Sequence, residues 1–441
     1  MVKKVLDYYF YAKVGKIMAK ISKPRGTEDL LFEETNRWHI MEAIIRNTAK
    51  KYNFQEVRTP IFESTELFVK GVGDTTDVVT KEMYTFLDKK DRSLTLRPEG
   101  TTGAIRAYIE HKMFGYDNQP VKLYYMGPMF RYERPQKGRQ RQFNQFGIET
   151  IGIKSPQVDV EIILVGLDVC KQMGLANLKV MINTLGDVES RASYREALIN
   201  YLNQYHDQLC RDCQTRLEKN PLRVLDCKID HDKDFMKNVP KLSEYLSTAA
   251  NNYFNEVLKI LNDLKIDFEI DERLVRGLDY YTDTIFEIVS LNEESGAQAT
   301  LIGGGRYDGL VASLGGPDVS GIGFGMGMER MLISAMIENP TLFKEKPLDL
   351  FIVPLSPDVF SYSMVVLEQL RAAGIVADME FFDKSLKAMF KYCERNNINY
   401  AIIIGENEMK NKTLILKDLV NNTQEELSES WIEIVLERIN K

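Results

Sequence analysis

The 441-residue chain is poor in cysteine and histidine and contains no long apolar run. Five cysteines, with no export signal ahead of them, predict a reducing cytoplasmic environment and exclude a disulfide-linked secreted domain. No apolar run approaches the length of a membrane span, so we expect no membrane contact. A net charge of -7 excludes a generally basic nucleic-acid coat. Any RNA contact must therefore come from local patches such as Lys137, Arg139 and Arg141.

The common glycine-rich nucleotide motifs are also missing. There is no G-x-G-x-x-G opening a helix and no G-x-x-x-x-G-K-[ST]. A nucleotide site in this chain must be of another kind. The remaining composition, with 27% charged and 44% hydrophobic residues, is typical of a globular protein, and the length allows two or three domains.

The segment from Gly127 to Glu149 predicts two strands joined by a cationic loop, with the turn at Pro135 and Gly138. A guanidinium on the first strand, that of Arg131, would be a rigid fork for phosphate oxygens. If 142–153 is a strand, period-two alternation places four residues on one face: Phe143, Gln145, Gly147 and Glu149. The pattern favours a nucleotide-binding floor, although a solvated basic hairpin would produce the same charge run.

A second glycine pattern, GIGFGMGMER, places Gly321, Gly323, Gly325 and Gly327 in strict alternation. In a strand this leaves one face bare, against which a flat ligand could lie. Arg330 would then stand at a helix start, where free backbone N–H groups favour anions. A glycine-rich buried strand with a bulge is the alternative.

Several segments of the chain resemble those of a known family, the class II aminoacyl-tRNA synthetases. Gly127–Glu149 is similar to motif 2, Gly321–Ile333 to motif 3, and FQEVRTPIFE around Pro60 to the dimer-forming motif 1. Three further segments are similar to signatures of the histidyl-tRNA synthetases: RPEGT at 97–101, LVRGLDYYT at 274–282 and GGGRYDGL at 303–310. The resemblance runs from about Ser22 to the C-terminus.

The resemblance implies a fold of three parts. These are an α+β catalytic domain with an antiparallel sheet flanked by helices, a helical insertion domain associated with the tRNA acceptor arm, and a C-terminal α/β anticodon-binding domain. We expect a tail over 1–21, disordered or loosely docked, for which translation upstream of a functional start at Met18 is one explanation. The expected domains are the catalytic domain at 22–186 and 248–338, the insertion at 187–247, a linker at 339–346 and the anticodon-binding domain at 347–441.

Hydrophobic periodicity predicts helices over 34–52, 100–112 and 159–173. After Pro347, short apolar runs alternate with helices expected over 364–373, 384–395 and near 426–439. Strands that alternate with helices indicate an α/β layer with a largely parallel sheet.

The function that the resemblance implies is ATP-dependent activation of L-histidine to histidyl-adenylate and transfer to the 3′ end of tRNA(His). ATP would be the substrate, Mg²⁺ would accompany it, and the chain would form a homodimer. The implied catalytic residues are Arg131, Arg276 and Arg330. The implied ATP-binding residues are Arg131, Glu133, Arg139, Phe143 and Arg330. The implied histidine-binding residues are Glu99, Gly100, Thr101, Gln145, Glu149, Arg276, Tyr280, Tyr281 and Tyr307.

Two features depart from this assignment or stand outside it. Gln140 occupies a position where many relatives carry an aromatic residue, which could alter loop packing without removing a phosphate ligand. Cys210, Cys213, Cys227 and His231, spaced C-x2-C-x13-C-x3-H, could supply four tetrahedral zinc ligands. Free cysteines are more often small buried apolar residues, so we assign no metal ligand.

Three other functions remain open at this stage. The chain could be a synthetase-like regulatory subunit of histidine biosynthesis that does not charge tRNA, a synthetase for another amino acid, or an RNA-binding regulator. The presence of 347–441 and of the three arginines argues against the regulatory subunit. LVRGLDYYT and GGGRYDGL argue against a different amino acid.

Overall fold

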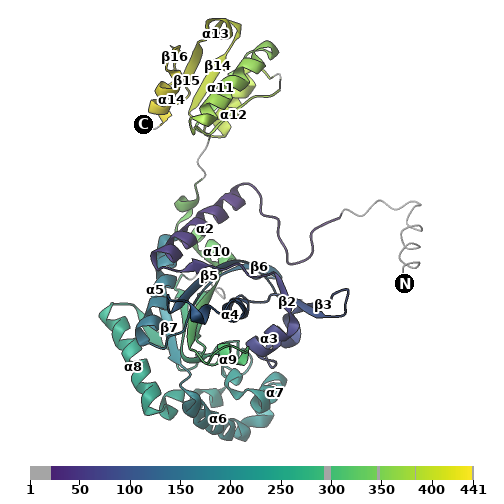
Figure 1. Ribbon diagram of the computed structural model, residues 1–441, viewed down its shortest axis with the longest axis vertical. Helices are drawn as coiled ribbons and strands as arrows, with labels where there is room; N and C mark the ends of the chain where they lie inside the picture. The colour runs from purple at the N-terminus through teal and green to yellow at the C-terminus, as the bar shows by residue number, and fades with distance from the viewer. Residues whose placement is uncertain (1–20, 293–298, 345–347, 383, 440–441) are drawn as a thin grey trace, which may run out of the picture. The chain divides into compact units, whose positions relative to one another are not determined.

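The computed structural model describes residues 21–292, 299–344, 348–382 and 384–439 (Figure 1). All of the expected tail over 1–21 except Ile21 lies outside the described residues. The chain divides into two compact units, Met1–Phe343 and Lys344–Lys441. Phe343 is buried in the core of the first unit. The linker expected over 339–346 therefore overlaps the end of that unit.

Within the described residues, the first unit is built on a sheet of eight strands. The six central strands are antiparallel to one another, and each edge strand is parallel to its neighbour. Across the sheet the strands are β1 (Gln55–Glu56), β5 (Val121–Phe130), β6 (Gln142–Ile151), β11 (Gly321–Gly327), β10 (Thr300–Arg306), β9 (Thr282–Ser290), β7 (Leu178–Thr184) and β8 (Phe268–Ile270). An antiparallel sheet flanked by helices was the expected fold class, and it is confirmed.

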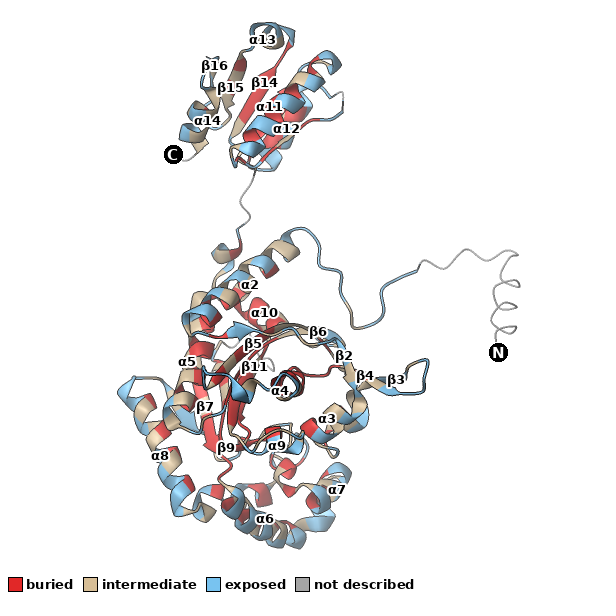
Figure 2. Ribbon diagram, viewed as in Figure 1, coloured by how far each residue is buried: buried red, intermediate tan, exposed pale blue. Residues whose placement is uncertain are grey.

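Helices cover one face of this sheet and enclose the main core (Figure 2). They are α2 (Glu33–Lys51), α5 (Pro156–Gln172), α8 (Thr248–Asp263) and α10 (Met328–Glu338). Trp38, Met41 and Ile45 recur at helical spacing on α2 and are buried. Phe146 of β6 and Phe324 of β11 meet them from the sheet, where their rings pack edge to face. The helices predicted over 34–52 and 159–173 are confirmed, with slightly shifted ends.

The other face of the sheet is only partly covered. Here lie α3 (Thr65–Val72), α4 (Thr101–Glu110), α9 (Leu310–Ser313) and a small antiparallel sheet of β2 (Phe62–Ser64), β4 (Ser93–Leu96) and β3 (Tyr84–Leu87). The α4 helix confirms the prediction over 100–112. It packs Ile105 and Tyr108 against one end of the sheet, which leaves the rest of this face as a floor.

The segment around Pro60, which resembles motif 1, contributes only a short edge strand to the main sheet. β1 contains only two residues, and neither of its side chains is buried. Apolar side chains are nevertheless exposed nearby, on or next to the two outer strands of the small sheet: Ile61, Phe62, Phe86 and Leu87. The rings of Phe62 and Phe86 lie 6.4 Å apart in an edge-to-face arrangement. We call these four residues the apolar tip.

The segment 187–247 is helical, with α6 (Val188–Leu202), α7 (Arg211–Lys219) and short 3₁₀ turns at 203–208, 221–224, 234–238 and 242–245. Asp187 caps α6, because its carboxylate accepts the backbone N–H of Ser190 at 2.9 Å. Tyr194, Leu198 and Phe235 belong to a core that this segment has of its own.

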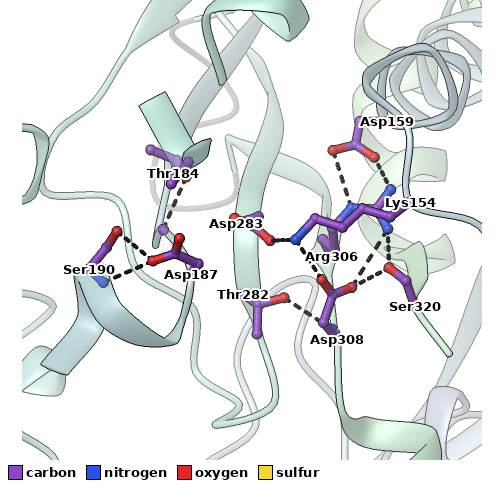
Figure 3. Close-up of polar contacts among 12 residues, drawn as sticks. Lys154, Asp159, Thr184, Asp187, Ser190, Thr282, Asp283, Arg306, Asp308 and Ser320 are labelled. Atoms are coloured by element: carbon purple, nitrogen blue, oxygen red, sulfur yellow. Dashed lines mark hydrogen bonds and ion pairs between the residues drawn. The ribbon is translucent and has the colours of Figure 1, made fainter. Parts of the chain in front are cut away.

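A buried polar network ties the sheet to α5 (Figure 3). Arg306 of β10 is fully buried and pairs with the equally buried Asp159 of α5. Its guanidinium also donates to the carbonyl of Ile153 and to the hydroxyl of Ser320. Lys154 bridges Asp283 and Asp308 beside this pair, at 2.5 and 2.9 Å. These contacts join segments that are far apart along the chain.

The C-terminal unit contains a five-stranded sheet in the order β13 (Ala377–Met379), β12 (Leu350–Pro354), β14 (Tyr400–Ile404), β15 (Leu414–Asp418) and β16 (Thr423–Leu427). Its helices are α11 (Phe360–Ala372), α12 (Leu386–Arg395), α13 (Glu406–Asn411) and α14 (Trp431–Ile439).

Two predictions for this unit need correction. The sheet is mixed, because β12 is parallel to β13 and β14 whereas β15 is antiparallel to both of its neighbours. β15 and β16 are joined by a short hairpin loop, which cannot connect parallel strands. The last helix begins at Trp431 and not near Glu426, which lies in β16. Across the described residues, no helix has the length and apolarity that crossing a membrane requires.

Candidate active site

A cavity of about 400 Å³ opens on the uncovered face of the first unit's sheet. This size is ordinary for a small-molecule site. Most of the residues predicted from the sequence line it: Glu99, Thr101, Arg131, Glu133, Arg139, Phe143, Gln145, Arg276, Tyr280, Tyr281 and Arg330. They come from strands, loops and a helix start that are widely separated in sequence. Gly100, Glu149 and Tyr307 are absent from the cavity wall.

Arg131 follows directly after the last residue of β5, so the expectation that it lies within the strand is off by one position. Its Nε donates to the carbonyl of Pro98 at 2.8 Å, and its guanidinium lies 5.5 Å from the centre of the Phe143 ring. Both contacts hold the guanidinium in place at the cavity wall. In the loop beyond, Arg139 pairs with Glu133 at 3.3 Å.

Arg276 precedes β9 and forms an ion pair with Glu287 of that strand. Its guanidinium lies over Gly303, where any Cβ would overlap Nη2, and 5.6 Å from the Tyr281 ring. Glu287 stands opposite Gly303 in the strand register. Sequence reasoning missed Glu287, although a carboxylate in the otherwise buried strand 282–290 was a signal that a cation lay nearby.

Arg330 lies in the first turn of α10, as predicted. Its guanidinium donates to the carbonyls of Thr300 at 3.2 Å and Gly138 at 3.5 Å. Burial lowers the pKa of Arg330, and the neighbouring charge of Arg139 lowers the pKa further. The arginine therefore lies in a positive environment that a bound anion would relieve.

The bare face of β11 is mostly filled by protein, which corrects the expectation that a flat ligand lies along it. A Cβ at Gly321 would overlap the ring of Tyr307, and one at Gly323 would overlap the carboxylate of Glu149. Gly325 makes room for Gln145 of β6. Only Gly325 and Gly327 reach the cavity wall, so the ligand-accessible part of this strand is its C-terminal end.

The three predicted residues that do not line the cavity are buried. Glu149 is fully buried and accepts the hydroxyl of Tyr307 at 2.5 Å and that of Tyr125 at 3.3 Å. Burial raises the pKa of Glu149 to about 8, although the hydrogen bond from Tyr307 opposes the increase. Gly100 leaves space for the Tyr125 ring. Tyr125 was missed because an apolar strand gives no reason to single out one tyrosine.

Polar groups also cluster at the start of α4, at the edge of the cavity. The carboxylate of Glu99 accepts the backbone N–H groups of Thr101 and Thr102, both at 2.8 Å. The side-chain oxygen of Gln145 accepts the N–H of Gly100 at 3.2 Å. Glu99 and Gln145 are thereby fixed in orientation with further acceptor capacity for a ligand.

The helical segment contributes residues that sequence reasoning did not assign to the site. Arg216, Arg223 and Asp226 line the cavity. Arg223 donates to the carbonyl of Gly277 and pairs with Asp279 at 3.2 Å. No motif in the sequence marks these residues, because their position depends on how the helical segment folds back.

The candidate zinc quartet is only partly assembled. Cys210, Cys213 and Cys227 lie together, but the fourth member of the group is Asp230, and His231 lies outside it. His231 is half exposed, and its Nδ1 lies 3.5 Å from the carboxylate of Asp232.

Comparison with known proteins identifies a family for this chain. A family model described as histidyl-tRNA synthetase matches residues 26–331, and one described as an anticodon binding domain matches 349–438. The histidine–tRNA ligase of Bacillus subtilis strain 168 is 50% identical over 405 residues, which cover 92% of this chain and 96% of the relative.

Solved structures give the same result. The apo histidyl-tRNA synthetase of S. aureus matches with a TM-score of 0.80 and 40% identity, covering 94% of this chain and 100% of that chain. A Bacillus halodurans protein described as an ATP phosphoribosyltransferase regulatory subunit/histidyl-tRNA synthetase shares the fold, with a TM-score of 0.61 at 18% identity over 89% of this chain and 99% of its own. From the family match and the near-full-length identity, the chain is a member of the histidyl-tRNA synthetase family.

Proposed function

We propose that this chain activates L-histidine with ATP and transfers the histidyl group to the 3′ end of tRNA(His). Family membership supports the reaction, and one observation supports its location: Arg131, Arg276 and Arg330, from three separate segments, line a single cavity. A cavity with three guanidinium groups is suited to a polyanion such as a triphosphate, which can be bound at several points.

In the activation step the carboxylate of histidine attacks the α-phosphorus of ATP. An oxygen–phosphorus bond forms, the bond to the β-phosphate oxygen breaks, and pyrophosphate leaves with its electron pair. The protein contributes positioning and charge neutralisation. Arg131 and Arg276 would neutralise the α-phosphate and the reacting carboxylate, while Arg330 would hold the far phosphate. Arg139 would cover the phosphates from its loop.

The nucleotide base would lie on Phe143, with Glu133 near its amino group. Phe143 lines the cavity beside Arg131 and presents an aromatic face for stacking. Glu133 is held by Arg139, so its carboxylate is already oriented.

Histidine would lie at the deep end of the cavity. Glu99, Thr101 and Gln145 would accept hydrogen bonds from its ammonium, and Tyr280 and Tyr281 would enclose the imidazole. We propose that Gly100, Glu149 and Tyr307 act from beneath the floor, where they shape and polarise this end. Buried polar groups that the wrong amino acid leaves unpaired discriminate strongly.

Magnesium fits this cavity as a companion of the phosphates. The only group of three or more metal-ligating side chains among the described residues is the cysteine cluster of the helical segment. Mg²⁺ usually binds through phosphates, water and one or two carboxylates, and Glu329 offers a carboxylate at the cavity wall. The ion would neutralise charge on the leaving pyrophosphate.

For the transfer step we propose that the phosphate of the adenylate accepts the proton of the ribose hydroxyl, since no side chain is an obvious base. The C-terminal unit would bind the anticodon and 187–247 the acceptor arm. We further propose a homodimer, because the apolar tip exposes four large side chains that an interface would cover. The enzyme would act in the cytoplasm.

Pyrophosphate exchange measured with each of the amino acids, followed by charging of tRNA(His), tests this proposal. Exchange with histidine alone and charging of the tRNA would support it. Exchange with none would favour a regulatory subunit, and exchange with another amino acid would favour a synthetase of different specificity.

A further inference from the structure

Three thiols and one carboxylate converge in the helical segment 187–247. Cys210 precedes α7, Cys213 lies in the first turn of that helix, Cys227 follows the turn at 221–224, and Asp230 comes three residues later. One ligand atom from each lies within 4.8 Å of the others. Cys213, Cys227 and Asp230 are buried, and Cys210 is half-buried.

The separation of two of the sulfur atoms matches that of neighbouring ligands in a tetrahedral zinc site. The sulfur atoms of Cys210 and Cys227 lie 3.7 Å apart. In a tetrahedral site with zinc–sulfur bonds of about 2.3 Å, neighbouring sulfurs are separated by about 3.8 Å. A disulfide would require a sulfur–sulfur distance of about 2.05 Å. The pair is therefore spaced for joint coordination and not for a covalent bond.

Apolar packing alone does not explain this group. Cys213 and Cys227 belong to the core of the segment, where small apolar side chains would suffice. Asp230 is instead a fully buried carboxylate that faces the sulfurs. Its oxygens accept the backbone N–H of Cys210 at 3.0 and 3.2 Å and pair with Lys233 at 2.7 Å. These contacts fix the orientation of the carboxylate beside the three sulfur atoms.

We propose that Cys210, Cys213, Cys227 and Asp230 bind a structural zinc ion. Zinc takes four tetrahedral ligands from thiolates and carboxylates, and four protein ligands leave no position open for chemistry. Three thiolates and a carboxylate exceed the charge of Zn²⁺. Lys233, which contacts Asp230, and Arg216, which lies within electrostatic range of Cys213 and Cys227, supply compensating charge.

The zinc ion would hold together the two ends of the segment that contacts the cavity. Between Cys213 and Cys227 lie Asn220, which donates to Asp279 at 2.8 Å, and Arg223, which contacts Gly277 and Asp279. Gly277 is adjacent to Arg276. Loss of the ion would release this wall and slow activation. The consequence for activity rests on the proposed function, whereas the zinc site itself does not.

The test is metal analysis of the full-length chain purified without chelator. About one zinc ion per chain is expected, with X-ray absorption showing three sulfur ligands and one oxygen ligand. Cobalt exchanged for zinc should give thiolate-to-metal charge-transfer absorption. Asp230→Asn, which keeps the side-chain size, should weaken zinc binding at least about tenfold. His231→Ala and Cys393→Ala are matched controls that should retain the metal.

Several results would overturn the proposal. The proposal is wrong if the purified protein contains no zinc and does not take up zinc when zinc alone is added. It is also wrong if freshly purified protein contains a disulfide bond between Cys210 and Cys227. Zinc retained by Asp230→Asn but lost from His231→Ala would sink the ligand assignment. Zinc-stripped protein, restored with Mg²⁺ and showing unchanged pyrophosphate exchange, would contradict the link to the cavity. Failure of exchange in zinc-loaded protein would instead count against the proposed function.

Discussion

Gly303 of β10 leaves the space in which the guanidinium of Arg276 lies, because a Cβ at this position would overlap Nη2. Gly303 is also opposite Glu287 in the strand register, so one glycine lets an arginine from a distant loop reach its carboxylate partner. This glycine serves a side chain of the protein and not the ligand directly.

Gly303→Ala should therefore lower the rate of histidine activation by displacing Arg276. We expect kcat of pyrophosphate exchange to fall at least about tenfold, since small displacements of a charge-stabilising group are costly. Gly115→Ala is a matched control, because a Cβ there meets nothing within 4 Å. Equal activity in the two variants would show that Arg276 does not need its observed position.

Arg276→Ala should reduce turnover more than binding. Its charge matters most as negative charge develops in the transition state, so kcat should fall about 10²- to 10³-fold with little change in KM for ATP. Steady-state exchange kinetics measure both constants. Arg276→Lys keeps the charge without the fork and should recover part of the rate. An increase in KM at constant kcat would contradict the assigned role.

Phe143→Leu should instead raise KM for ATP and leave kcat nearly unchanged, because stacking on the base is present before and during the reaction. Loss of one stacked aromatic ring costs about 1–3 kcal/mol, which predicts that KM for ATP increases roughly 5- to 160-fold. KM for histidine is the internal control and should not move. A lower kcat with normal KM for ATP would exclude a stacking role.

Glu149 should make the stability of the protein fall as pH rises. Burial raises its pKa to about 8 in the folded state, above the ordinary value of 4.5. Its contribution is therefore fully present below about 4.5 and is lost as pH rises through the folded-state pKa of about 8. Within this window the slope is at most about 1.4 kcal/mol per pH unit.

Urea unfolding of the wild type and Glu149→Gln across this window measures the effect. The variant keeps an acceptor for the hydroxyl of Tyr307 but does not titrate. The free energy of unfolding of the wild type should therefore fall relative to that of the variant as pH rises from about 4.5 to about 8. Parallel curves for the two proteins would show that Glu149 has an ordinary pKa.

Arg306→Met should be strongly destabilising, because it leaves the carboxylate of Asp159 buried without its partner. Breaking such a pair typically costs about 3–5 kcal/mol. Lys122→Met, which breaks the more exposed pair with Glu161, should cost no more than about 1 kcal/mol. Urea midpoints measure both. Adding Asp159→Leu to Arg306→Met should restore part of the loss, and a still lower midpoint would argue against an uncompensated charge.

Local patterns predicted much of the molecule correctly. The alternation in 142–151 identified the face of β6 that carries Phe143 and Gln145, and the helical spacing of Trp38, Met41 and Ile45 identified α2. Both depend only on the periods of strands and helices. Strand and helix-start patterns singled out Arg131 and Arg330, and motif resemblance added Arg276. The convergence of the three could not be read from spacing.

Other features were decided by the packing of segments that are distant in sequence. Asp159 and Arg306 lie 147 residues apart, and Arg223 reaches Asp279 across 56. Spacing alone could not show that Asp230, and not the adjacent His231, lies with the three cysteines.

By itself, the amino-acid sequence determined the family, the periodic elements and the identity of most cavity residues, because those follow from local chemistry along the chain. Tertiary structure alone decided which groups lie behind the cavity floor, what the glycines make room for, and which side chains gather around the three cysteines. The reason is that burial and contact between remote segments depend on how the whole chain packs and not on the order of its residues nearby.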